Sequence, residues 1–385
     1  MDFKKIAEEI NDEVIYLRRE LHKKAELSFC EFKTAEFIVN YLKKSDVTIR
    51  ENVAKTGVLA YLDAGAKETL LLRADMDALP ITEPLTNAVR SENEGVMHAC
   101  GHDCHMAVML GAAKVLSGLK DSLSKNILFV FQPGEETTGG ALPMIETGIL
   151  KEFNVTSALC LHVANDVPCG KVAVSHGGVM ASPDDFCLKI IGKGGHGAYP
   201  HKCINPITIS SHIVSGLNDI SSKIVAKKVI SVCSISGGNS SNVIPDDVTL
   251  LGTVRTYDEK LRKEIPEMME KMISDVCKSF GAKYELTYNF RYPPLINDDS
   301  LADKVTKISK DLLGAENVIT DHEPSMAGDD FAYFAKEVPA VYFNLGSGNE
   351  KRGILEPLHS TDFDIDESCL KLGVSLICKL AISLD

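Results

Sequence analysis

Apolar residues near the start of the chain recur at intervals of three and four residues. This period is typical of an amphipathic helix, which we predict over residues 2–25, with a second helix near residues 31–44. The positions that carry the first pattern are Ile6, Ile10, Val14, Leu17 and Leu21.

Short apolar runs then alternate with helical patterns, and this alternation predicts an α/β sheet with parallel strands and covering helices. The predicted strands are residues 57–62, 69–74, 126–131 and 158–161, and a helix is predicted over residues 106–119. The α/β character returns after Asn297, with predicted helices at 300–313 and 329–335 and a strand at 340–345.

Between these parts, the chain changes character near Ser182. The predicted order there is strand, helix, two strands, helix and strand, which is the ferredoxin-like arrangement. The elements are strands 186–192, 229–236, 248–257 and 284–292, and helices 206–222 and 259–280. At 385 residues the chain exceeds what one hydrophobic core usually holds. We therefore predict a main domain, 1–181 and 294–385, with a parallel-rich mixed sheet, interrupted by an inserted α+β domain at 182–293.

Charge and hydropathy exclude several classes of protein. The net charge is −13, and no run of Lys and Arg forms the basic stripe of a nucleic-acid-binding protein. The sequence holds no run near the ~20 apolar residues of a membrane helix, and residues 1–9 lack the apolar core of a signal peptide. We expect a cytoplasmic protein that binds neither nucleic acid nor membranes.

Residues that can ligate metals follow the predicted strands of the main domain. Carboxyl ends of parallel strands meet at one edge of a sheet, where ligands bind, so we expect these side chains to lie together. They are Asp75, Asp77, Glu135, Glu136, His162 and, beyond a Gly-rich loop after 340–345, His359. The segment 97–105 adds Cys100 and His102, and thiolate, imidazole and carboxylate are the ligands of zinc and similar ions. A structural metal site is the alternative interpretation of that segment.

Two carboxylate pairs suggest a division of roles. Glu135 and Glu136 are adjacent in a turn, so one can bind a metal while the other acts as a general base. Adjacency alone does not say which, and a solvated pair is the alternative. Asp75 and Asp77 can serve a turn or orient a ligating imidazole. In the inserted domain, His196 lies in a Gly-rich loop that can be merely exposed.

Taken together, these motifs resemble the M20 peptidase/amidohydrolase family, and most closely its subfamily D. That branch includes N-acyl-amino-acid amidohydrolases, hippurate hydrolases, N-acetyldiaminopimelate deacetylases and plant auxin-conjugate hydrolases. The matching segments, in family order, are residues 73–81, 97–103, 133–136, 194–201, 242–245, 252–255 and 358–360.

The resemblance implies a role for each matching residue. Two divalent ions (Zn, Mn, Co or Ni) would be held by Cys100 as the bridge together with His102, Glu136, His162 and His359. Glu135 would be the general base and Asp77 the carboxylate that orients a ligand. His196 would stabilise the oxyanion across a homodimer interface made by the inserted domain, and Asn242 and Arg255 would position the substrate.

The expected reaction is hydrolysis of an N-acyl amino acid, with acetyl or benzoyl as the acyl group. Water activated by the metals and deprotonated by Glu135 would attack the amide carbonyl, releasing a carboxylate and a free amino acid. Three alternatives stay open. They are a metallo-dipeptidase or carboxypeptidase with the same chemistry, a thiol hydrolase with Cys100 as nucleophile and His102 or His105 as its base, and a metal-binding protein without activity.

Overall fold

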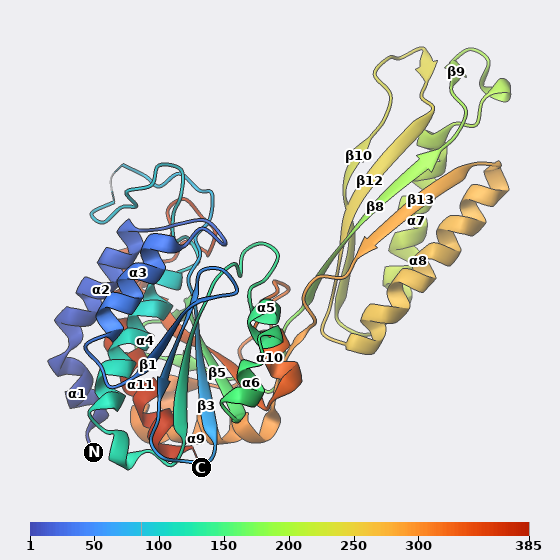
Figure 1. Cartoon of the computed structure of the whole chain (residues 1–385). Coiled ribbons are helices and arrows are strands. Elements are labelled where there is room, and N and C mark those ends of the chain that lie inside the picture. The colour runs from blue at the N-terminus through green and yellow to red at the C-terminus, as the bar shows by residue number, and fades with distance from the viewer. Residues whose placement is uncertain (86, 385) are drawn as a thin grey trace. The chain divides into compact units, whose positions relative to one another are not determined.

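A computed structural model describes residues 1–85 and 87–384, which form two compact units (Figure 1). Unit 1 contains Met1–Gly177, Ile296–Glu323 and the chain from Asp330 onward. Unit 2 contains Gly178–Leu295 and Pro324–Asp329. Among the described residues, no helix combines the length and apolar character that crossing a bilayer requires.

Unit 1 is built on an eight-stranded sheet with the order β1-β2-β4-β3-β5-β16-β6-β15. Its centre is parallel, because β3 pairs in parallel with β4 and β5, and β5 pairs in parallel with β16. β1 and β2 are antiparallel at one edge. The prediction of a parallel-rich mixed sheet is therefore confirmed. The strands are β1 Thr48–Val53, β2 Gly57–Leu62, β3 Thr69–Asp75, β4 Asn126–Gln132, β5 Val155–Pro168, β6 Val172–Ala173, β15 Val318–Ile319 and β16 Ala340–Gly348.

Helices flank this sheet, and α1, α2, α3, α4, α9 and α11 share one hydrophobic core with it. α4 lies at the centre of the helical layer, where it packs against α2 and α11, and nearly every residue of α4 is buried. The helices of unit 1 are α1 Phe3–Glu9, α2 Asn11–Lys23, α3 Phe32–Leu42, α4 His102–Ser117, α5 Ala141–Glu146, α6 Ile149–Glu152, α9 Asp299–Leu313, α10 Ala332–Glu337 and α11 Cys369–Ser383, with 3-10 turns at Lys120–Ser122, Ala315–Asn317 and Glu350–Arg352.

The single helix predicted over residues 2–25 is wrong. Ile10, with φ −109° and ψ 5°, leaves the helical region and separates α1 from α2. Val14 N–H still donates to the Ile10 carbonyl at 3.0 Å, so the apolar positions before and after the break stay near one face. The periodicity therefore continues through a break that it does not reveal.

The Gly-rich segment after residue 345 is strand, where a loop was predicted. β16 continues to Gly348 because glycines allow β5 to come very close. A Cβ on Gly346 would lie 2.1 Å from the Pro168 carbonyl oxygen, and one on Gly348 would lie 2.0 Å from that of Asn165. These glycines permit strand pairing at a point where a side chain would block it.

Unit 2 contains a four-stranded antiparallel sheet with the order β10-β12-β8-β13. Buried and partly exposed residues alternate along β8, as expected for a sheet with one face on a core. α7 and α8 pack on that face and begin at the capping residues Asn205 and Asp258. The elements are β8 Ser182–Ile191, β9 Gly195–His196, a 3-10 turn at Pro200–Lys202, α7 Pro206–Lys223, β10 Lys228–Ser236, β11 Val243–Ile244, β12 Asp247–Thr256, α8 Glu259–Phe280 and β13 Lys283–Asn289, with β7 Gly177–Met180 and β14 Leu295–Asn297 at its borders.

Candidate active site

The sequence 100–102 places two side chains that can bind a metal, Cys100 and His102, where α4 begins. Gly101 is in the left-handed region at φ +79°, between Cys100 and the first helical residue, His102. A Cβ on Gly101 would lie 2.3 Å from a methyl carbon of Val163 on β5. Glycine is therefore required both by the backbone conformation and by the close approach of β5.

His162 was predicted to follow its strand, but it lies within β5. β5 extends well beyond β3: the pairing of the two strands runs as far as Arg73 and Cys160, and β3 ends at Asp75. His162 pairs with Asn344 of β16 and so lies level with the end of β3. The imidazole reaches the carboxyl edge of the sheet because β5 runs past that edge.

The five predicted metal ligands lie together in unit 1. The Cys100 Sγ lies 3.6 Å from His162 Nε2. Glu136 Oε1 lies 3.8 Å from His102 Nε2 and 3.3 Å from His359 Nε2. His359, an exposed residue with φ +65°, is held by a backbone hydrogen bond of 2.8 Å from its N–H to the Ala99 carbonyl.

Hydrogen bonds leave the Nε2 atoms of two histidines facing the cluster. His102 Nδ1 is 2.8 Å from the Asp77 carbonyl oxygen, and His162 Nδ1 is 2.7 Å from that of Val163. A carbonyl can only accept, so each Nδ1 donates, and each neutral ring then presents Nε2 as a lone pair. This is the usual arrangement of imidazoles that ligate metals.

Divalent cations fit this set of donors. His102 Nε2 and Glu136 Oε1 are buried and have no hydrogen-bond partner among the described residues. Burial and the nearby carboxylates of Glu136 and Glu135 raise the pKa of the Cys100 thiol well above its usual value. Burial disfavours a charged His102, but the carboxylates, Asp75 foremost, raise its pKa to about 10. Excess negative charge in a buried cluster of thiol, imidazole and carboxylate is what a bound cation would balance.

Asp77 connects the turn that carries Glu135 and Glu136 with the ring of His102. Its carboxylate accepts hydrogen bonds from the backbone N–H groups of Glu135, at 3.0 Å, and Glu136, at 2.9 Å. It also accepts the Ser28 hydroxyl at 2.6 Å and lies 3.6 Å from His102 Nδ1. One buried side chain thus fixes the turn that carries both glutamates and contacts the ring of His102.

A second set of buried partners surrounds Asp75. His105 Nδ1 lies 2.6 Å from Asp75, and His105 Nε2 accepts the Val163 N–H at 2.9 Å. Arg73 donates to the other Asp75 oxygen at 2.6 Å. Burial opposes ionisation of Asp75, yet the Arg73 guanidinium, His102 and His105 hold the pKa of that carboxyl well below its usual value. The sequence offered His105 only as an alternative base for a Cys100 nucleophile, and it assigned no role to Arg73.

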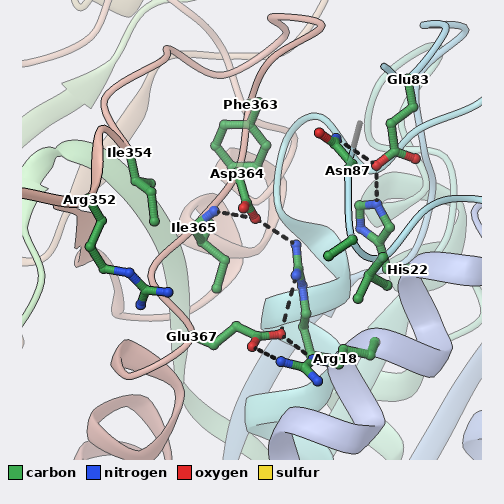
Figure 2. A pocket seen from close by; sticks show the side chains of 13 residues that line it. Arg18, His22, Glu83, Asn87, Arg352, Ile354, Phe363, Asp364, Ile365 and Glu367 are labelled. Atoms are coloured by element: carbon green, nitrogen blue, oxygen red, sulfur yellow. Dashed lines mark hydrogen bonds and ion pairs between the residues drawn. The ribbon is translucent and has the colours of Figure 1, made fainter. Parts of the chain in front are cut away.

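A third network supports the start of α4 from α2. Arg18 Nε and His22 Nδ1 lie 2.8 Å and 2.7 Å from the buried Asp103 carboxylate. Figure 2 shows the outer side of this network, where His22 reaches Glu83 and Arg18 reaches Asp364 and Glu367. The helical period assigned His22 and Arg18 no part in the site, because polar residues on an amphipathic helix usually face solvent.

The remaining predicted residues lie in unit 2. His196, in β9, pairs with Val243 of β11, and the Gly197 N–H donates to the Asn242 carbonyl at 2.8 Å, so His196 and Asn242 belong to neighbouring segments. Arg255 lies in β12, where its Nε donates to Thr253 Oγ1 at 3.0 Å.

The comparison with known proteins decides the family. Residues 71–383 match the model of "Peptidase family M20/M25/M40". This chain belongs to the M20 family. The predicted family is thereby confirmed, and the protein is a hydrolase by descent.

Individual relatives of this M20 protein match from about three quarters to nearly all of the chain. It is 38% identical over 97% of its length to thermostable carboxypeptidase 2 of Saccharolobus solfataricus, 96% of which is covered. It is 41% identical to an N-acyl-L-amino acid amidohydrolase of Geobacillus stearothermophilus, over 77% of this chain and 81% of the relative. The structure of the Bacillus subtilis YXEP protein, described as a dinuclear metal-binding M20 peptidase, superimposes with a TM-score of 0.85 at 31% identity, covering 97% of this chain and 98% of that one.

Proposed function

We propose that this protein hydrolyses the amide bond of N-acyl amino acids, with acetyl, benzoyl or a similar acyl group. The observation that carries the proposal is a single turn in which Glu136 faces two imidazoles while Glu135 lies beside it, with both backbone N–H groups fixed by Asp77. Metal storage needs ligands but no general base, so the pairing of a ligand with a second carboxylate favours catalysis. The names of relatives such as the Geobacillus amidohydrolase support the substrate class.

In this proposal Cys100, His102, Glu136, His162 and His359 would hold two divalent ions. Such ions lower the pKa of water and polarise a carbonyl oxygen. The protein supplies the orientation of the ligands. Asp77 accepts the hydrogen bonds that fix the turn of Glu136, and its own carbonyl fixes the tautomer of His102.

Glu135 is the proposed general base. Its carboxylate lies within 4.8 Å of ligand atoms of both His102 and Glu136, so it borders the metal cluster. It would take a proton from the attacking water and pass that proton to the leaving amine. A positioned base typically contributes about 10²–10⁴-fold to the rate. Turnover of Glu135→Gln near the wild-type rate, with metal still bound, would refute this role.

The proposal extends to unit 2 and to a homodimer. His196 would stabilise the oxyanion of the partner's reaction, and Asn242 and Arg255 would bind the amino acid part of the substrate. The guanidinium of Arg255 suits a carboxylate. Mixing inactive Glu135→Gln subunits with inactive His196→Ala subunits tests this arrangement, since activity returns only if His196 acts across an interface.

The test of the reaction is a screen of N-acetyl, N-benzoyl and indole-acyl amino acids after loading with Zn, Mn, Co or Ni. A chelator separates this proposal from a Cys100 thiol hydrolase, because a thiol enzyme keeps its activity when the metal is removed. Burial and the nearby carboxylates, which raise the pKa of Cys100, also disfavour the thiolate that such an enzyme needs. An inert protein that carries its full metal content would favour the non-enzymatic alternative.

A carboxypeptidase is the second candidate, because the Saccharolobus relative with that name is 38% identical to this chain. The chemistry would be unchanged, and the group on the acyl side of the bond would be a peptide. Comparison of kcat/KM for N-acetyl amino acids and for N-blocked dipeptides with the same C-terminal residue discriminates between the two.

A further inference from the structure

The turn that carries Glu135 and Glu136 is held by two buried carboxylates. The N–H groups of Gly134, Glu135 and Glu136 all donate to carboxylate oxygens. Asp77 accepts the second and third, and Glu31, which directly precedes α3, accepts the first at 3.0 Å. Three consecutive donors of this turn are therefore directed by Asp77 and Glu31.

The Glu31 carboxylate has a fixed position. Its side chain is fully buried, and the oxygen that accepts the Gly134 N–H also accepts the Phe29 N–H at 2.8 Å. The other oxygen accepts the Thr56 hydroxyl. Burying a carboxylate is costly unless its oxygens are hydrogen-bonded. Hydrogen bonds on both oxygens compensate for that cost and leave the group little freedom.

The residues just before Glu31 pack on the same turn. Gly134 has φ +69°, and a Cβ there would lie 2.4 Å from two ring atoms of Phe29. Phe29 itself has φ +59°, uncommon for an aromatic residue, and Ser28 donates its hydroxyl to Asp77. The segment 28–31 thus contacts this turn and the carboxylate that holds it through a ring, a hydroxyl and a second carboxylate.

We propose that Glu31 is a positioning residue for Glu135 and Glu136, acting through the backbone of Gly134. This inference rests on the proposed function for its kinetic part. Polar partners that orient the ligands of a metal site are typically worth about 10- to 100-fold in metal affinity or activity. Glu31 would not contact a metal ligand directly. It would hold the backbone that carries the proposed ligand Glu136 and the proposed base Glu135.

Three substitutions of Glu31 distinguish the effect of side-chain length from the effect of charge. Gln keeps the length: its carbonyl can accept the two N–H groups, and its amide can donate to Thr56. Asp keeps the charge but withdraws the oxygens by one methylene, and Ala removes the carboxylate. We expect Glu31→Gln to stay close to wild type, while Glu31→Asp and Glu31→Ala lose about 10- to 100-fold in kcat at saturating metal, with KM little changed.

Metal affinity gives a readout that does not need turnover. Competition with a chromophoric zinc chelator should show weaker binding in the same order, with Ala and Asp weaker than Gln, because Glu136 lies on the same turn. Thr56→Val is the matched control. It removes the hydrogen bond to the oxygen of Glu31 that does not contact the turn, while the bonds from Phe29 and Gly134 to the other oxygen remain. It should therefore lower the melting temperature and cost much less kcat and zinc affinity than Glu31→Asp.

Wild-type kcat and zinc affinity in Glu31→Asp would overturn the inference, as would equal kinetic losses in Thr56→Val. If Glu31→Ala does not fold, the contrast between Gln and Asp decides the question. If the wild-type protein hydrolyses no N-acyl amino acid, the proposed function fails. The zinc affinities of the Glu31 variants would still test the positioning role.

Discussion

Gly101→Ala perturbs the link between two proposed metal ligands without removing either of them. The substitution adds one methyl group to a residue at φ +79°, between Cys100 and His102. The new Cβ would lie 2.3 Å from Val163 Cγ2, closer than non-bonded carbon atoms come. The Val163 side chain, β5 or the start of α4 must therefore shift, and both β5 and α4 carry proposed ligands.

Two terms set the size of the effect. An alanine in the left-handed region costs roughly 1–2 kcal/mol, offset by about 0.4–1 kcal/mol from the loss of unfolded-state freedom. Overpacking against Val163 adds about 1–3 kcal/mol. Gly65 provides a matched control, since it has φ +73° and no atom within 4 Å of the point that a Cβ would occupy. Gly65→Ala therefore carries the backbone cost and its offset, without the overpacking.

The assay is urea unfolding of both variants, combined with elemental analysis of the purified proteins. We expect Gly101→Ala to be less stable than Gly65→Ala by about 1–3 kcal/mol, and to bind less metal because Cys100 and His102 are displaced. Equal free energies of unfolding for the two variants would refute the steric argument. Full metal content in Gly101→Ala would refute the claim that this glycine sets the ligand positions.

Further predictions concern the general base, the thiol ligand and the charged network beneath α4. Glu135→Gln should lose about 10²–10⁴-fold in kcat and keep its metal by elemental analysis. Cys100→Ala should purify with less metal than wild type, and an unchanged metal content would contradict its proposed role as a ligand. Burial disfavours a charged His22, but hydrogen bonds to Asp103 and Glu83 raise its pKa above 6.5, so its contribution to stability is complete below pH 6.5 and declines as the pH rises through the raised pKa. His22→Asn should therefore cost about 3–5 kcal/mol near pH 6 and less near pH 9, measured by urea unfolding of zinc-loaded proteins; a cost independent of pH would contradict a charged His22.

The spacing of apolar residues predicted those helices and strands that bury one face and expose the other. α8 spans Glu259–Phe280, the predicted range, because one face of a long helix packs on the sheet of unit 2 and the other is exposed. α11 escaped prediction because it is buried on most sides, so polar positions do not mark an outer face. β1 escaped it because Arg50 and Glu51 expose both faces of an edge strand.

The site was predictable as far as it depends on where strands end. Asp75, Asp77, Glu135 and Glu136 lie at or just beyond the ends of β3 and β4, so sheet topology alone brings them to one edge. His359 follows β16 through a longer segment, so the strand-end argument included it but placed it only loosely, and its role as a ligand came from the family resemblance. The separation of Glu135 from Glu136 came from the same source, because two adjacent carboxylates are equivalent until their surroundings are known.

The residues that support the site could not be predicted, since their partners lie far away in the sequence. Glu31 precedes an amphipathic helix and resembles an ordinary surface glutamate, yet it is fully buried and bonded to Gly134. Arg18 and His22 occupy a helix whose apolar period explains its other residues, and both meet Asp103. A metal-ligating residue at a strand end can be located from the sheet topology alone. The side chain that holds it in place depends on which distant segment covers the edge of the sheet, and that is determined only when the chain has folded.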